Sequence, residues 1–186
     1  YVLSEVITAV VWKLLLQPAG LVDGLLETFG LDRFGQLWLA DPEVVLSTVF
    51  VVVSWKYFGF HMILYLAALQ QIPAELEEAA AIDGAGKWAT FRHVVLPLLG
   101  PTIRISVFLS IIGSLQLFDM VWVLTGGGPI SASDTMATYM FDRGFKRSRF
   151  GYGSAVAVIV FLISFVTALA YQRFVLRRDV KGALTA

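Results

Sequence analysis

A short polar stretch, residues 73–97, holds the residues whose types and spacing point most clearly to a function. Three carboxylates, Glu75, Glu77 and Glu78, follow Pro73. Proline suits the first turn of a helix, and acidic side chains there face the positive end of the helix dipole, so we expect a helix over residues 73–83. Gly84 and Gly86 can end this helix in a left-handed cap.

One face of this expected helix carries mostly small side chains, which permit close docking into a groove of a partner protein. Helical spacing assigns to it Leu76, Ala79, Ala80 and Asp83. The chemistry indicated is protein–protein recognition. The alternative is a plain helix-turn-helix whose carboxylates form a solvated face.

A second group of candidates lies within apolar segments of membrane-spanning length, where polar side chains are costly and mark pathways. Between residues 102 and 124, helical spacing places Ser110, Gly113, Ser114 and Leu117 on one face. A small, polar face suits a cavity for a hydroxylated ligand. Glycine and serine are also favoured where membrane helices pack against each other, and this alternative stays open.

Trp55 and Lys56 lie near the middle of another apolar segment, residues 44–69. A lysine at that depth should face water, protein or a ligand, because burying its charge in lipid is unfavourable. The ring of Trp55 offers a flat face on which a ligand can stack. Alternatively, Lys56 extends along the helix towards the membrane surface.

The composition indicates that lipid surrounds much of the chain. Of 186 residues, 58% are hydrophobic and 15% are charged, and the mean hydropathy is +0.76. Soluble domains carry about 25% charged residues. Because a helix needs about 20 apolar residues to cross the hydrocarbon core, the sequence predicts spanning helices at residues 44–69, 102–124 and 152–176, and a shortened fourth at 1–16.

Basic residues near the helix ends predict the orientation. They are concentrated in the tail, residues 173–181, and between residues 87 and 104, so both stretches should lie on the cytoplasmic side. Residues 143–149 then lie outside although they include four basic side chains around Asp142, which runs against the same rule.

Several other chemistries are not supported. There is no Cys, and therefore no disulfide or thiolate. His61 and His93 lie on different elements and suggest no metal pair. The glycines at 126–128 lack the following Lys-Ser/Thr of a P-loop, so we expect no ATP site. A net charge of zero and scattered basic residues argue against nucleic-acid binding. No catalytic constellation is evident.

The polar stretch resembles the cytoplasmic coupling loop of ABC-importer permeases. The match consists of Glu78-Ala79-Ala80, then Gly84, then Val94, Leu96 and Pro97, at the family spacing without a gap. Residues 69–85 are similar to the carbohydrate branch of that family, which includes maltose and glycerol-3-phosphate systems. Residues 125–129, preceded by Phe118-Asp119, resemble the maltose-F-like subunit.

The resemblance implies an all-α, polytopic bundle of transmembrane helices with the type I ABC-importer permease fold. It implies that residues 1–186 form a permease domain, N-terminally truncated to about four spans, with the coupling loop at residues 73–97. The expected location is the bacterial or archaeal cytoplasmic membrane. The expected function is ATP-driven carbohydrate import by alternating access.

The same resemblance implies the partners and the contact residues. A cytoplasmic ATPase dimer would bind ATP and Mg²⁺, so this chain would be no enzyme and carry no cofactor. A second permease subunit and an extracytoplasmic sugar-binding protein would complete the transporter. The ATPase contacts would be Glu78, Ala79, Ala80, Asp83, Gly84 and Ala85. Ser110 and Ser114 correspond to substrate-contacting positions of maltose-type permeases.

Two other classes of function remain as alternatives. An ion-coupled secondary transporter should have an essential buried carboxylate, for which Asp119 is the candidate. A membrane scaffold that transports nothing would have a dispensable Glu78 and no cavity.

Overall fold

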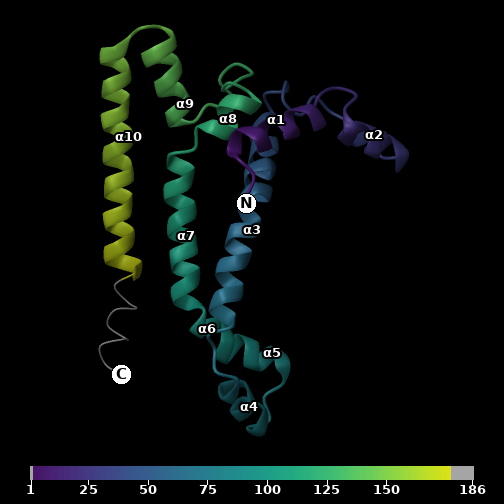
Figure 1. The fold of residues 1–186 in the computed structure, drawn as a ribbon, viewed down its shortest axis with the longest axis vertical. Helices are drawn as coiled ribbons and strands as arrows, with labels where there is room; N and C mark the ends of the chain where they lie inside the picture. The colour runs from purple at the N-terminus through teal and green to yellow at the C-terminus, as the bar shows by residue number, and fades with distance from the viewer. Residues whose placement is uncertain (1, 177–186) are drawn as a thin grey trace. The chain divides into compact units, whose positions relative to one another are not determined.

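A computed structural model describes residues 2–176, apart from the side chain of Asp32, and all the regular structure in that range is helical (Figure 1). This confirms the all-α prediction. The described residues divide into two compact units, one with residues 2–58 and 113–164 and the other with residues 59–112 and 165–176. Three long helices contribute to both units: α3 (Val45–Leu69), α7 (Gly100–Leu115) and α10 (Phe150–Tyr171).

The first unit is built on α1 (Glu5–Leu15), the N-terminal part of α3, and α8 (Asp119–Leu124). Their apolar side chains meet in a core whose fully buried members include Ala9, Val45, Val52, Met120 and Val121. The unit also contains α2 (Leu21–Thr28), the 3-10 turn η1 (Asp32–Phe34), α9 (Met136–Phe141), the π-helical turn η3 (Asp142–Lys146) and the start of α10.

The second unit contains the rest of α3, then α4 (Ala74–Ile82), α5 (Lys87–Thr90), the π-helical turn η2 (Phe91–Val95), α6 (Leu96–Leu98), most of α7, the end of α10 and η4 (Gln172–Leu176). Pro97 accounts for the π-helical turn, because it has no N–H to donate and its ring crowds the preceding carbonyls. Gly100 and Pro101 follow, and the axis bends by 62° between Lys87–Leu98 and Gly100–Leu115.

The described residues include two helices long and apolar enough to cross a membrane, Val45–Leu69 and Phe150–Val175, or three spans if the bent pair is counted as one. These two confirm the predictions at 44–69 and 152–176. The shortened fourth segment predicted at 1–16 contains the 11-residue helix α1, which is too short to be counted as a span. This helix ends at Leu15, and the chain turns at Pro18–Gly20. Residues 177–186 of the tail lie outside the described residues, so the orientation stays a prediction.

The prediction of one continuous helix over residues 102–124 is wrong. Helix α7 ends at Leu115, and α8 begins only at Asp119. Between them, the hydroxyl of Thr135 donates to the carbonyl of Leu117 at 2.7 Å. Met120, Val121 and Leu124 are buried against α1 and α3, so packing in the first unit outweighs the apolar continuity of the sequence.

Helix α4 ends in a Schellman motif, in which a left-handed residue turns the chain and the last carbonyls are satisfied. Gly84 has φ of +81°, its N–H donates to the carbonyl of Ala81 at 3.0 Å, and the N–H of Ala85 donates to that of Ala80 at 2.9 Å. Pro73 lies one position before the helix rather than in its first turn. Gly86 is not part of this cap, because it has φ of −73° and begins α5.

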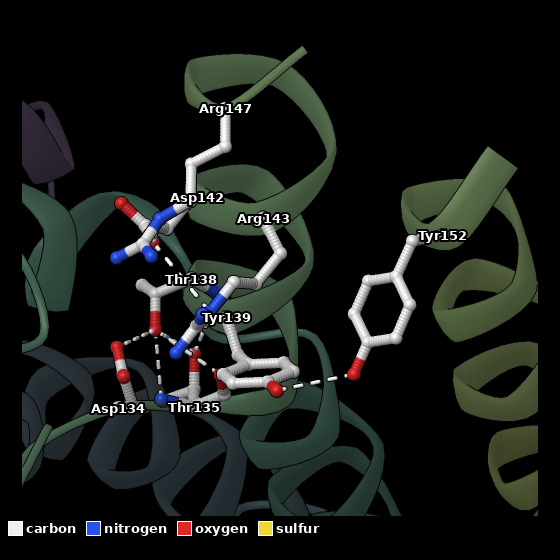
Figure 2. A network of polar contacts seen from close by, with 8 residues as sticks. All are labelled: Asp134, Thr135, Thr138, Tyr139, Asp142, Arg143, Arg147 and Tyr152. Atoms are coloured by element: carbon white, nitrogen blue, oxygen red, sulfur yellow. Dashed lines mark hydrogen bonds and ion pairs between the residues drawn. The ribbon is translucent and has the colours of Figure 1, made fainter. Parts of the chain in front are cut away.

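Figure 2 shows a polar network around α9 and the start of α10. The hydroxyl of Thr135 accepts from the N–H of Thr138 at 3.2 Å, and the hydroxyl of Thr138 accepts from the N–H of Thr135 at 2.8 Å. This reciprocal capping box fixes the start of α9. The hydroxyls of Tyr139 and Tyr152 lie 3.1 Å apart and link α9 to α10.

Asp142 accounts in part for the basic residues that the predicted orientation places outside the cytoplasm. Arg147 donates to its carboxylate at 3.1 Å, and Arg143 lies 3.9 Å from the same oxygen (Figure 2). All three side chains are partly exposed, so the pairs offset charge locally and contribute little to stability.

Helix α10 meets η3 at two glycines. A Cβ built on Gly153 would lie 2.6 Å from the Cα of Gly144, closer than real Cβ atoms come. The absence of a side chain therefore lets the two backbones touch.

We expect Gly153→Ala to lower the free energy of unfolding by about 1–3 kcal/mol, because the added methyl group must push α10 away from η3. Thermal unfolding of the purified protein in detergent would measure this. Gly151→Ala is the matched control, since nothing lies within 4 Å of a Cβ at Gly151. Equal melting temperatures for the two variants would contradict the close packing.

We expect Gly84→Ala to destabilise the end of α4 by about 1–2 kcal/mol, because left-handed backbone is unfavourable for residues with a Cβ. No clash contributes, since no atom lies within 4 Å of that Cβ. Hydrogen exchange of the Ala85 amide should become roughly tenfold faster. Gly86→Ala should leave this rate nearly unchanged, and similar acceleration in both variants would rule out the capping role.

Candidate functional site

The predicted coupling loop, residues 73–97, exposes acidic and apolar side chains together. Glu78 is exposed and makes no hydrogen bond or ion pair with any other described residue. On the same side of α4, one turn further, Ile82 is 86% exposed, and Trp88 on α5 is 72% exposed. Both apolar side chains are therefore accessible to a partner.

An adjoining side of α4 faces α5 and η2 across a hollow of about 490 Å³. Glu77 and Ala81, one helical turn apart, line this side, and Ala85 lines the hollow from beyond the Gly84 cap. Of the residues predicted to contact an ATPase, Glu78, Ala79, Asp83 and Gly84 are exposed, and Ala80 and Ala85 are half-buried. The short helix and its cap thus present the predicted contact residues on one compact projection.

A cluster of hydroxyl and imidazole groups joins α3 to α7 within the second unit. The hydroxyl of Tyr65 donates to Oγ of Ser106 at 2.9 Å, and that Oγ lies 2.8 Å from Nδ1 of His61. Nε2 of His61 lies 3.3 Å from Oγ of Ser110, which donates to the carbonyl of Ser106 at 3.0 Å. Ser106 is 5% exposed, whereas Ser110 is exposed.

Sequence reasoning missed three of these four residues, although a signal was present. His61 and Tyr65 are spaced by four residues in one apolar segment, and Ser106 and Ser110 are spaced by four in another. Two such pairs on two neighbouring membrane helices can meet across the interface.

Of the other predicted pathway residues between 102 and 124, only some lie on α7 with Ser110. Gly113 and Ser114 lie in the last turn of α7 and are exposed, as Ser110 is. Leu117 lies beyond the end of α7 and is half-buried, so the prediction that it shares a helical face with the serines is wrong. Beyond the end of the helix, the Leu117 carbonyl accepts from the hydroxyl of Thr135.

Trp55 and Lys56 belong to the first unit. The ring of Trp55 is 54% exposed and meets the ring of Trp12 edge-on, with centroids 5.5 Å apart. Lys56 is 3% exposed and donates to the carbonyl of Leu3, so its ammonium group contacts protein and does not extend to the helix end. A role for either residue in a substrate pathway stays a prediction.

The glycine-rich loop after α8 is held by side-chain hydroxyls. Oγ1 of Thr125 lies 2.7 Å from Oγ of Ser133 and accepts from the N–H of Gly127 at 3.2 Å. Ser133 donates to the carbonyl of Gly128 at 2.6 Å. These bonds satisfy the polar backbone of a loop adjoining the buried core.

Neither an ion-coupling carboxylate nor a metal centre emerges from the described residues. Asp119 is exposed in the first turn of α8 and is not the buried carboxylate that an ion-coupled transporter needs. Within residues 2–176, no group of three or more His, Cys, Asp or Glu side chains could hold a metal ion. His93 contacts the carbonyl of Ala89 on its own helix, at 3.0 Å from Nδ1.

The chain is similar to membrane subunits of sugar transporters. It is 36% identical to a sulfoquinovosyl glycerol transport permease of Agrobacterium fabrum over 86% of this chain and 51% of that protein. It is 33% identical to a lactose transport permease of Rhizobium radiobacter over 96% of this chain and 60% of that protein. The chain therefore spans roughly half to three-fifths of the length of these relatives.

A solved structure agrees with these similarities. It is a bacterial alginate ABC transporter in complex with an alginate pentasaccharide-bound periplasmic protein. One of its chains matches with a TM-score of 0.82 and 28% identity, over 92% of this chain and 60% of that one. The family model for binding-protein-dependent transport system inner membrane components matches residues 3–180, and the chain belongs to that family.

Proposed function

We propose that this chain is part of a membrane permease subunit of an ATP-driven, binding-protein-dependent sugar importer. The observation that carries the proposal is the exposed, capped helix α4 with Glu78 and Ile82 on its outer side. The location is the bacterial or archaeal cytoplasmic membrane, which the chain crosses more than once. Family membership and the sugar-transport relatives support this assignment.

In the proposed mechanism, the loop at residues 73–97 docks on a separate cytoplasmic ATPase dimer. That dimer binds ATP and Mg²⁺ and supplies the free energy of transport. Ile82 and Trp88 would be covered on docking, and Glu78 would gain a polar partner that it lacks among the described residues. Closure of the ATPase would move α4 as a unit, because its cap fixes the turn that leads to α5.

The permease would pair with a second permease subunit, and the two would alternate between an inward-facing and an outward-facing cavity. An extracytoplasmic sugar-binding protein would deliver the substrate, as the alginate pentasaccharide-bound periplasmic protein supports by analogy. Ser110, Gly113 and Ser114, with Trp55, Lys56 and Leu117 as further candidates, would line the pathway. The relatives carry different sugars by name, so the proposal is limited to carbohydrates as a class.

We expect Glu78→Ala to abolish most ATP-dependent sugar uptake in proteoliposomes that contain the assembled transporter, while the complex still forms. The reason is that a docked carboxylate loses a charge-assisted bond, which contributes about 1.5–3 kcal/mol. Uptake of radiolabelled sugar and release of phosphate would be measured together, so that uncoupling is seen directly.

Glu27→Ala is the control, because Glu27 is also an exposed carboxylate on a short helix but lies outside residues 73–97. Its uptake should match the unaltered protein. Normal uptake and normal ATPase stimulation in the Glu78 variant would contradict the proposed coupling role of Glu78.

A further inference from the structure

The hydroxyl–imidazole cluster between α3 and α7 determines which atom of His61 carries its proton. Ser106 is buried, so its hydroxyl proton needs an acceptor. Tyr65 donates to Ser106, and the remaining partner of that hydroxyl is Nδ1 of His61 at 2.8 Å. Ser106 therefore donates to Nδ1, and the neutral imidazole carries its proton on Nε2.

This assignment fixes the hydrogen-bonding character of Ser110. Nε2 of His61 donates to Oγ of Ser110 across 3.3 Å, and Ser110 donates its own proton to the carbonyl of Ser106 at 3.0 Å. One lone pair of the Ser110 oxygen stays unused. Since Ser110 is exposed, that lone pair can accept a bond from a ligand, while its proton stays engaged within the helix.

We propose that His61, held by Ser106 and Tyr65, is a positioning residue that makes Ser110 a fixed acceptor for a hydroxyl group of the transported sugar. The inference rests on the proposed function and deepens it. It assigns the contact a direction, with the ligand donating and Ser110 accepting. A neutral polyol fits such an acceptor, whereas a ligand that offers only acceptor oxygens at this position does not.

Two substitutions of His61 separate positioning from packing. In His61→Gln, the longer amide can place its nitrogen near the former Nε2 and still donate to Ser110. In His61→Asn, the shorter amide can accept from Ser106 but cannot reach Ser110. Tyr65→Phe keeps the aromatic ring and removes the hydroxyl that donates to Ser106.

The first measurement is sugar uptake by the assembled transporter in proteoliposomes, with lactose and an alginate pentasaccharide as probes. We expect His61→Asn to raise the KM about three- to tenfold with little change in maximal rate, the loss of one neutral hydrogen bond. His61→Gln should stay within about twofold of the unaltered protein, and Tyr65→Phe should fall between them. A KM that is unaltered in His61→Asn, or raised equally by both amides, would overturn the inference.

The second measurement does not depend on transport. Nitrogen-15 NMR of the labelled protein in lipid reports the protonated nitrogen of each histidine, and the signal lost in His61→Gln belongs to His61. We expect the neutral Nε2–H form, and a neutral Nδ1–H form or an imidazolium would overturn the inference. Absence of ATP-dependent uptake of every sugar in a panel that includes both probes would count against the proposed function, while the NMR result still decides the tautomer of His61.

Discussion

In an apolar surrounding, a polar group has to find its hydrogen-bond partner within the protein, because no water is available to supply one. This constraint explains why the polar side chains on the apolar helices are hydrogen-bonded to other groups of the chain. Lys56 donates to a backbone carbonyl, Thr135 satisfies the free carbonyl of Leu117, and the histidine on α3 has a serine on each ring nitrogen. Among the buried side chains of the described residues, the hydroxyl of Ser164 is the one polar group without a partner.

The coupling loop differs, because several of its exposed side chains have few or no partners within the chain. Its helix buries no residue, and Glu78 makes no hydrogen bond or ion pair with another described residue. Ile82 and Trp88 stay largely exposed, although the ring of Trp88 stacks on that of Phe91. The loop nevertheless keeps a defined shape, because the Gly84 cap satisfies the last carbonyls of α4 and because α4 lies against η2. A rigid element with an unsatisfied outer surface is suited to transmit motion from a partner.

The sequence predicted best those features that depend on local chemistry. Apolar runs of spanning length predicted α3 and α10, and a glycine after a short acidic helix predicted the left-handed end of α4. The prediction failed where a contact between residues far apart in the sequence determines the local structure. Nothing local marks the end of α7 at Leu115, because the residues that follow it pack against α1 and α3 and the Leu117 carbonyl is satisfied by the distant Thr135. The bonds of His61 were missed for the same reason, since they join helices more than 40 residues apart.

The central claim is that α4 docks on an ATPase, and crosslinking from Ile82 tests it most directly. The chain has no cysteine, so Ile82→Cys introduces a single reactive site on the most exposed apolar side chain of α4. The account predicts a crosslink to the co-expressed ATPase whose yield changes when ATP is added. A cysteine that reacts with a membrane-impermeant reagent from outside the cell, and forms no crosslink to the ATPase, would contradict both the orientation and the coupling mechanism.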